Sequence, residues 1–556
     1  MTALAGAYVQ SVDWLAIAPP TIAAVAALAV LVADLFLAER NKPLLGWFAT
    51  AGLALAALLL LPLRAGDRST FCLTSDPDVC SYRADEFAVV IQFLVLGGAL
   101  LTALLSMSTV HNRGSRDAGD GDTGAAGRAD ARDAAEGGKL PAGEFWFLLL
   151  SSAAGAALLP ASRDLATLVV ALEVASLPAF ALVGLRRGDR LSSEAALKFF
   201  LSSVTATAVM LMGVSFVYAA TGSLHLSRIA AALGHVDPRL DTLAQAGVVL
   251  TLVGFAFKTA AVPFHFWVPD TYVGAPIPVA AYLSVIGKAV GFSGLILVTV
   301  LAFPAYADVW GPAVAVLAAL TMTAGNVAAL RQRPERAHSA VRLLAWSSVG
   351  QAGYLLVPIA AAGYADSSGD AAHAIGSTVA YALMYAAVNL GAFAVVALVS
   401  RTHPTGRLSD YRGLYATRPL TALALGFFLL CLAGLPPGVI GLFAKVTVFS
   451  AAVDAGLGWL AVVMAVNVVI ALYYYLQWMA VLFRAPAGAP APAGAPAPAG
   501  APVPAGAEPT APATPALATR AVPASLTAVI GLAAVLGVAL SGAPQLVLRF
   551  ASGALL

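Results

Sequence analysis

The chain has 556 residues, of which 60% are hydrophobic and only 11% are charged. Because soluble globular proteins carry about 25% charged residues, this composition excludes them and predicts an all-α integral membrane protein built of long apolar helices. A net charge of +2 gives no reason to expect nucleic acid as a partner. The three cysteines form no CxxC motif, which excludes an iron–sulfur or zinc framework, and no glycine-rich phosphate loop follows a strand pattern.

Apolar stretches of about 20 residues, the length that crosses roughly 30 Å of hydrocarbon, recur along the whole chain. We predict fourteen membrane spans, the twelfth of them with a break, over 16–37, 44–63, 87–109, 144–161, 164–184, 196–220, 243–264, 277–302, 310–330, 342–362, 373–400, 419–450, 457–483 and 524–548. No basic segment precedes the first stretch and no small-residue cleavage site directly follows it, so we expect this helix to be retained.

The basic residues of the predicted loops are distributed unevenly between the two sides of the membrane. If the N-terminus faces outside, twenty Lys and Arg residues fall in cytoplasmic loops and seven fall on the opposite side. This bias follows the positive-inside rule. We therefore expect both the N-terminus and the C-terminus to face outside.

The four remaining basic residues are all lysines within predicted spans, namely Lys198, Lys258, Lys288 and Lys445. A lysine in hydrocarbon costs about 2.5–3.5 kcal/mol even on a lenient scale, but unlike arginine it can release its proton when desolvated. One carboxylate, Glu173, also lies well inside a span. We interpret the set as groups that handle protons. The alternatives are structural salt bridges, or lysines near helix ends whose ammonium groups reach water.

Prolines interrupt two of the spans. In GFAFKTAAVPFHFW, Pro263 follows Lys258 and precedes His265, a candidate proton carrier between lysines. In AGLPPGVIGLFAKVTVF, the pair 436–437 precedes Lys445. Proline removes a backbone donor and breaks a helix, and the reversed order of lysine and proline is what two inverted repeats would produce. A proline that only kinks its helix is the alternative.

The domain organisation follows from these spans and from two polar or low-complexity stretches. We predict a three-helix N-terminal segment (1–111), a flexible cytoplasmic loop (112–143), two five-helix repeats (144–302 and 310–483), a Pro/Ala-rich linker (484–523) and a C-terminal helix (524–556). Cys72 and Cys80 lie in a loop expected to be external, where they form either a disulfide or two free thiols. Cys431 is expected to be a small core residue.

Several segments together resemble a known family. They are GFAFKTAAVPFHFWVPDTYVGAPIPVAAYL, RLLAWSSVGQAGYLLV, YRGL, LAGLPPGVIGLFAKVTVF and LYYYLQ. In these the chain resembles the antiporter-like membrane subunits of the proton-translocating NADH-quinone oxidoreductase, respiratory complex I, and within them subunit N most closely. The resemblance covers roughly 15–548.

The resemblance implies fourteen helices, two inverted five-helix repeats and one proton channel. It implies that Glu173 and Lys258 form a switching pair, that Lys288 is the central relay and that Lys445 is the terminal lysine. Two further site residues, Lys198 and His265, also match family positions. Where relatives often carry a histidine in the tenth span, this chain has Gly350-Gln351, so this position is expected to orient water rather than to titrate.

The resemblance also implies partners and cofactors. The chain would act as a subunit of an enzyme whose NADH, FMN, iron–sulfur clusters and quinone are bound by partner subunits, with no cofactor in this chain. Its partners would be other complex I membrane subunits, including further antiporter-like ones, and the lipid bilayer. The high Ala, Gly and Arg content is similar to that of GC-rich bacteria, whose plasma membrane is the expected location. The alternatives are an Mrp-type cation/proton antiporter subunit, a solute transporter and a structural membrane subunit.

Overall fold

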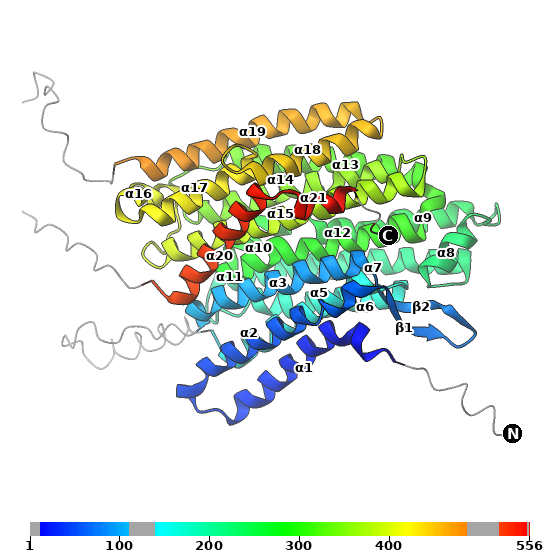
Figure 1. The fold of residues 1–556 in the computed structure, drawn as a ribbon, viewed down its shortest axis with the longest axis horizontal. Helices are drawn as coiled ribbons and strands as arrows, with labels where there is room; N and C mark the ends of the chain where they lie inside the picture. The colour runs from blue at the N-terminus through cyan, green and yellow to red at the C-terminus, as the bar shows by residue number, and fades with distance from the viewer. Residues whose placement is uncertain (1–11, 111–139, 486–521, 553–554, 556) are drawn as a thin grey trace, which may run out of the picture.

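The structure is a computed structural model that describes residues 12–110, 140–485, 522–552 and 555. Most of the predicted loop 112–143 and of the predicted linker 484–523 lies outside these described residues. The described chain is a bundle of roughly parallel long helices, with a small β-hairpin at one end (Figure 1).

Thirteen helices of the described chain are long and apolar enough to cross a membrane. Those in the N-terminal half are α1 (Trp14–Phe36), α2 (Pro43–Leu58, continued to Ala65), α3 (Glu86–Val110), α5 (Ala142–Leu158, continued to Ala161), α6 (Leu165–Val183), α7 (Arg190–Thr221) and α9 (Asp241–Thr259). The eighth is a continuous span, 277–302, formed by α11 (Ile277–Tyr282), the π-helical segment η5 (Leu283–Gly287), α12 (Lys288–Ile296) and a second π-helical segment.

The C-terminal half supplies the other long helices. They are α13 (Ala307–Leu330), α14 (Ser339–Ala362), α15 (Ser368–Ser400), α19 (Gly458–Phe483) and α20 (Ala524–Gly542). The shorter elements of the chain are α8 (Leu226–Leu233), α10 (Trp267–Gly274), α16 (Leu414–Thr417), α17 (Pro419–Ala433), α18 (Val439–Asp454) and α21 (Gln545–Ser552). The predicted last span, 524–548, is therefore two helices, because the backbone leaves helical geometry at Ala543.

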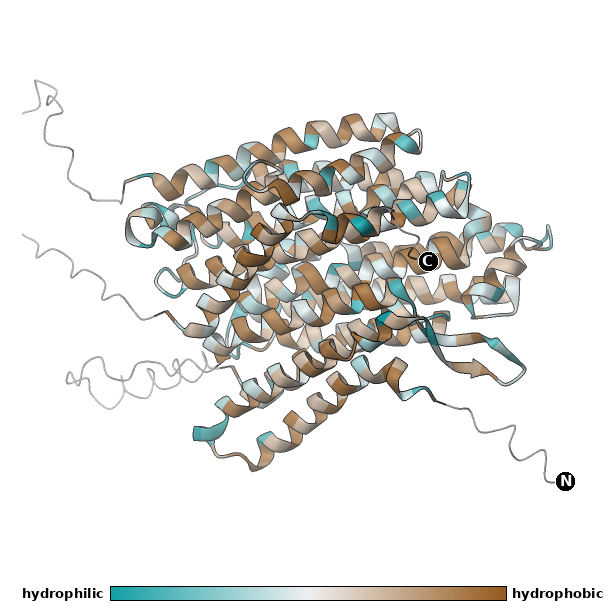
Figure 2. Cartoon of the chain, viewed as in Figure 1, coloured by the Kyte–Doolittle hydropathy of each residue, from teal (hydrophilic) through white to brown (hydrophobic). Residues whose placement is uncertain are grey.

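Burial separates central helices from peripheral ones. In the apolar 18-residue stretch of each span, 94% of the residues are buried in α14, 89% in α15 and 83% in the span 277–302, but only 28% in α20. Figure 2 shows apolar residues along the outer helices and hydrophilic residues gathered at both ends of the bundle. This is the pattern of a lipid-facing surface between two aqueous interfaces, and it places α12, α14 and α15 in the middle.

Two spans are interrupted, in each case beside a lysine. α9 ends at Thr259, where Ala260 takes left-handed geometry with φ 66°, and the helix resumes as α10 at Trp267. α17 ends at Ala433, where Gly434 has φ 84°, and the chain becomes helical again as α18. The predicted span 243–264 is thus five residues too long at its C-terminal end. A broken helix frees backbone groups, which must find partners inside the protein.

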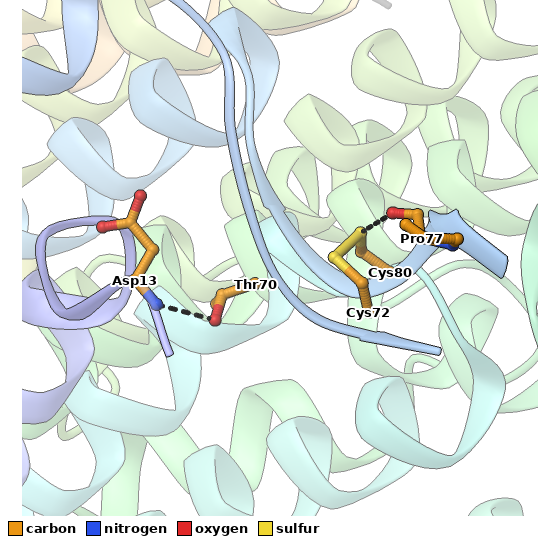
Figure 3. Close-up of a disulfide and its surroundings, with 5 residues drawn as sticks. All are labelled: Asp13, Thr70, Cys72, Pro77 and Cys80. Atoms are coloured by element: carbon orange, nitrogen blue, oxygen red, sulfur yellow. Dashed lines mark hydrogen bonds between the residues drawn. A yellow bond between two sulfur atoms is a disulfide. The ribbon is translucent and has the colours of Figure 1, made fainter. Parts of the chain in front are cut away.

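A hairpin that sequence analysis missed lies between α2 and α3. Strands β1 (Arg68–Leu73) and β2 (Asp76–Ala84) pair antiparallel, with Cys72 opposite Cys80. The two cysteines form a disulfide, which confirms the first of the two predicted alternatives (Figure 3). The third cysteine, Cys431, is a buried free thiol, as predicted.

Contacts between connections define the two ends of the bundle. At one end the hairpin meets the start of α1, where the Asp13 amide donates to Thr70 Oγ1 over 3.0 Å, and the amide of Arg163 donates to the Ser81 carbonyl over 2.8 Å. At the other end His338 and Thr405 share a backbone hydrogen bond of 2.7 Å. We call this second end, which carries the connections 331–338 and 401–418 and the first turn of α14, the arginine-rich side.

Candidate functional site

Lys258 lies in the last turn of α9, directly before the break. Its Nζ donates to Ser176 Oγ of α6 over 2.6 Å and to Ser203 Oγ of α7 over 2.8 Å. The residue is 6% exposed, and the rings of Phe180 and Phe257 lie 5.2 Å and 5.8 Å from Nζ. The ammonium group is therefore desolvated and held by neutral hydroxyls and ring faces rather than by a carboxylate.

Glu173, the predicted partner of Lys258, lies one turn away from this seat. Thr207 Oγ1 donates to Glu173 Oε1 over 2.7 Å. Thr207 lies one turn after Ser203 on α7, and Glu173 lies one turn before Ser176 on α6. No ion pair among the described residues includes Glu173. The structure thus brings the two predicted groups onto neighbouring turns without direct contact.

Lys288 begins α12 at the end of the π-helical segment η5. Its Nζ donates to Ser348 Oγ of α14 and, over 3.4 Å, to the Ser284 carbonyl one turn earlier. Tyr385 of α15 contacts both partners, at 3.0 Å from Ser348 Oγ and 3.2 Å from the Ser284 oxygen. Asn389 donates to Ser284 Oγ over 2.6 Å. Lys288 is 2% exposed, so its charge depends on these hydroxyl and carbonyl oxygens and on the Tyr272 ring, whose centroid lies 5.9 Å from Nζ.

Lys445 uses backbone carbonyls that the second break leaves free. Its Nζ donates to the Leu432 carbonyl over 3.0 Å and to the Ala433 carbonyl over 2.6 Å, at the C-terminal end of α17. A helix C-terminus carries unpaired carbonyls and partial negative charge, which suits an ammonium group. The Tyr354 ring lies 5.6 Å from Nζ, and Lys445 is 4% exposed.

Gln351 occupies the position where the resembling family often has histidine. Its Nε2 donates to the Leu432 carbonyl over 3.4 Å and to Tyr475 Oη over 3.3 Å, and Tyr381 Oη donates to its Oε1. Gln351 therefore shares a carbonyl acceptor with Lys445 and orders two tyrosine hydroxyls around it.

A small cavity lies beside Lys445. It has a volume of about 20 Å³, and its walls include Gln351, Tyr381, Tyr385 and Lys445. A volume of about 10–15 Å³ is enough for one water molecule when polar partners surround it. Lys288, Ser348, Tyr385, this cavity and Lys445 thus form a continuous series of groups that can donate or accept hydrogen bonds.

The same continuity is not present between Lys258 and Lys288. Gly291 of α12 packs against the last turn of α9 so closely that a Cβ atom there would lie 2.7 Å from Thr259 Oγ1. Yet no hydrogen bond among the described residues joins the partners of Lys258 to those of Lys288. The two lysines are close through packing and separate in hydrogen bonding.

Lys198 is not a buried lysine, contrary to the sequence analysis. Its side chain is 49% exposed and pairs with Glu194 at 2.8 Å and with Asp270 at 2.9 Å. Asp270 also contacts Arg342 at 3.6 Å. The physical reason is its place near the start of α7, where a long side chain reaches the carboxylates of the arginine-rich side.

His265 lies in the break between α9 and α10 and contacts none of the buried lysines by a hydrogen bond. Its ring centroid is 5.5 Å from that of Trp346 on α14, and it lines an open pocket together with Arg331, Arg336 and Arg342. Among the described residues, neither Lys198 nor His265 shares a hydrogen-bond partner with the three buried lysines.

The hydroxyl and amide partners are what sequence analysis missed. They are Ser176, Ser203, Ser284, Ser348, Tyr385 and Asn389. One signal was available, because Ser176 follows Glu173 by three residues and so lies on the same helix face. In the described residues no group of three or more His, Cys, Asp or Glu side chains is arranged to bind a metal ion.

Buried lysines seated beside two broken helices, in a bundle of membrane spans, define an antiporter-like membrane subunit. Residues 162–471 match the family model described as NADH:quinone oxidoreductase/Mrp antiporter, TM. NADH-quinone oxidoreductase subunit N 2 of Streptomyces griseus subsp. griseus is 76% identical over 88% of this chain and 86% of its own length. The chain belongs to the subunit N family of NADH-quinone oxidoreductase.

Solved structures agree with this assignment. A chain of respiratory complex I from Thermus thermophilus, determined with bound aureothin, is 30% identical in sequence and superposes with a TM-score of 0.68. The match covers 96% of this chain and 100% of the Thermus chain. A chain of the Mrp complex from Dietzia sp. DQ12-45-1b is 21% identical with a TM-score of 0.71, over 97% of this chain and 96% of that one. The second likeness concerns the fold alone.

Proposed function

We propose that this chain is the proton-translocating subunit N of an NADH-quinone oxidoreductase and that its protons pass along Glu173, Lys258, Lys288 and Lys445. The observation that carries the proposal is the seating of three buried ammonium groups on hydroxyl and carbonyl oxygens. Each burial costs free energy, and hydroxyl partners, which accept one proton while releasing another, suit a relay better than a fixed salt bridge.

Within this relay, groups that form hydrogen bonds connect Lys288 to Lys445, whereas proton transfer from Lys258 to Lys288 requires a rearrangement. A proton on Lys288 passes through Ser348 and Tyr385 to a water in the small cavity and on to Lys445. Lys258 exchanges with Lys288 only after its seat on Ser176 and Ser203 rearranges. Glu173, one turn away, is the carboxylate that draws the ammonium from this seat.

The energy for transport comes from partner subunits. Moving one charge against 100 mV costs about 2.3 kcal/mol, and electron transfer from NADH to quinone in the rest of the complex supplies it. Glu173 suits this coupling because Val170, Val174 and Leu177 on the same side of α6 are exposed, so a charged group of a neighbouring membrane subunit could approach it. NADH, FMN, iron–sulfur clusters and quinone bind to those partners.

Lys198 and His265 have different roles in this proposal from the buried lysines. The Lys198 ammonium group forms ion pairs with Glu194 and Asp270. Because Asp270 belongs to α10, Lys198 is suited to hold α10 in place at the arginine-rich side. We place His265 beside the open pocket of the arginine-rich side rather than between the lysines.

The expected location is the bacterial plasma membrane, with both termini outside. The hairpin disulfide of Cys72 and Cys80 gives a direct test of the orientation. A membrane-impermeant maleimide, added to intact cells after mild reduction, should label these cysteines. Labelling only in broken cells would reverse the orientation.

The relay itself is tested by replacing its first two groups. Glu173→Gln and Lys258→Met should each strongly reduce the number of protons pumped per NADH oxidised in inverted membrane vesicles, while the complex still assembles. Lys42→Met is the matched control, because Lys42 pairs with Asp34 and Glu39 on the peripheral α1–α2 connection. Wild-type pumping by assembled Lys258→Met complexes would refute the proposal.

An Mrp-type cation/proton antiporter subunit is the second candidate, because the matching family model covers both kinds of protein. Co-purification separates the two. Subunit N should be recovered with flavin and iron–sulfur subunits, and its pumping should persist when choline replaces sodium and potassium. An antiporter subunit would show the opposite result on both counts.

A further inference from the structure

An open pocket on the arginine-rich side lies outside the relay. It has a volume of about 520 Å³ and is bordered by the break between α9 and α10 and by the connection from α13 to α14. Its polar lining is His265, Arg331, Gln332, Arg336 and Arg342. The geometry points to a binding site for the phosphate of an anionic phospholipid, with one acyl chain lying along α13.

The charge of the pocket favours an anion. Arg331 and Arg336 are exposed and form no ion pair among the described residues, while Arg342 has only the Asp270 carboxylate, at 3.6 Å, which it shares with Lys198. Three guanidinium groups in one pocket repel each other, and a phosphate between them would turn that repulsion into charge-assisted hydrogen bonds.

Three buried polar atoms of the lining lack a partner. They are His265 Nδ1, Gln332 Oε1 and Arg342 Nε. Buried polar atoms are rarely left without hydrogen bonds, so a ligand or ordered water is expected to meet these three. When the side chains that cover these atoms move aside, Arg342 Nε can donate to a phosphate oxygen, His265 Nδ1 can do so in the appropriate tautomer, and Gln332 Oε1 can accept from a headgroup hydroxyl. The headgroup of phosphatidylglycerol supplies both the phosphate oxygens and the hydroxyl groups.

An apolar stripe leads from the pocket into the membrane. Val316 and Leu320 of α13 are exposed, and Ala324 and Ala328 continue the stripe at four-residue steps to the pocket wall. Twelve residues of helix rise about 18 Å, which is about one leaflet of the roughly 30 Å hydrocarbon core. A basic pocket that ends an apolar stripe matches an amphipathic lipid better than free phosphate or an acidic peptide.

A lipid bound here would connect the first break to the second half of the site. The pocket touches His265 in the break after Lys258 and Trp346 of α14, two residues before Ser348, the acceptor of Lys288. The lipid would therefore hold the break between α9 and α10, α13 and α14 in one arrangement. Its loss should loosen the packing between the two halves.

The test uses the purified complex in detergent and phosphatidylglycerol as the probe. Removing two charges with Arg331→Gln plus Arg336→Gln should weaken phosphatidylglycerol binding about thirtyfold and lower by one the number of molecules retained in native mass spectra. Arg333→Gln is the matched control, because Arg333 lies in the same connection but does not line the pocket. Ala328→Leu, which narrows the wall without changing charge, should also release the lipid and serves if the double variant does not assemble.

Several results would overturn the inference. They are equal retention in all variants, equal loss in Arg333→Gln, and displacement of the lipid by inorganic phosphate or glycerol phosphate at the lipid's own concentration. A cross-link from the pocket to an acidic segment of a neighbouring subunit would also overturn it, because that segment would then be the occupant. None of these measurements depends on proton pumping, so failure here leaves the relay standing.

Discussion

Replacing Lys445 by methionine should remove proton pumping while leaving the subunit folded. The substitution takes the donor from the Ala433 carbonyl, whereas the Leu432 carbonyl keeps Gln351 Nε2 at 3.4 Å. One buried acceptor without a partner costs about 1–3 kcal/mol. Removing a buried ammonium group returns about 2.5–3.5 kcal/mol of its burial cost. Since the two effects oppose each other, we expect the stability of the subunit to change by no more than about 2.5 kcal/mol.

The transport effect should be much larger than the stability effect. Lys445 is the only titratable ammonium group at the small cavity, so protons that reach Tyr385 would have no basic acceptor beyond it. We expect NADH oxidation to continue with a lowered proton-to-electron ratio, measured in inverted vesicles by a pH-sensitive dye, and an unchanged amount of assembled complex in native gels.

Two outcomes would contradict different steps of this reasoning. A wild-type proton-to-electron ratio in assembled Lys445→Met complexes would refute the connected path from Lys288 to Lys445. A loss of assembly would instead refute the cancellation of the two free-energy effects. Lys42→Met, on the peripheral α1–α2 connection, should change neither quantity.

Three further predictions follow from particular contacts. Gln351→Leu should slow pumping several-fold and cost about 1–3 kcal/mol through unpartnered hydroxyls, while Gln351→His, which keeps a donor and an acceptor, should restore much of the rate. Gly291→Ala should lower the free energy of unfolding by about 1–3 kcal/mol in thermal denaturation, whereas Gly287→Ala, 3.9 Å from its nearest neighbour, should be neutral or slightly stabilising. Burial, and then the charges of Arg186 and Arg342, lower the pKa of His338 from its ordinary 6.5. Because the folded protein then binds this proton less well than the unfolded chain, stability should fall as the pH drops below 6.5. Asparagine tolerates the left-handed backbone at this position. In thermal denaturation measured at several pH values, the stability of His338→Asn should therefore fall less steeply with decreasing pH than that of the wild type.

The spans were predictable because their signal is local. Hydrophobicity and length place the eighth span at 277–302, where the structure also has it, and proline in the sequence marks each break. The hairpin 68–84 lies in the interval between two strong spans that the sequence predicts as a loop. Its pairing depends on contacts with Asp13 and Arg163, which are distant in the sequence.

The site was only half predictable for a related reason. The cost of a charge in hydrocarbon correctly marked Lys258, Lys288 and Lys445 as buried. The same argument failed for Lys198, although Glu194, four residues earlier on the helix, was a readable sign of an exposed ion pair. Most hydrogen-bond partners of the buried lysines belong to other helices, so no single segment of the sequence predicts them.

The placement of the first lysine decides where coupling can act. Lys288 is linked through Ser348 to Tyr385, and Tyr385 and Lys445 line the same small cavity, so we propose that a proton passes between these two lysines with little rearrangement. Lys258 is held by two serines, one turn from Glu173 and without a hydrogen-bonded link to Lys288. Neighbouring turns on a helix face are about 5–6 Å apart, a distance a lysine side chain can cover by changing rotamers. A partner subunit that alters the charge near Glu173 could therefore change which seat Lys258 occupies, and we infer that this step, rather than transfer among the later lysines, sets when a proton moves.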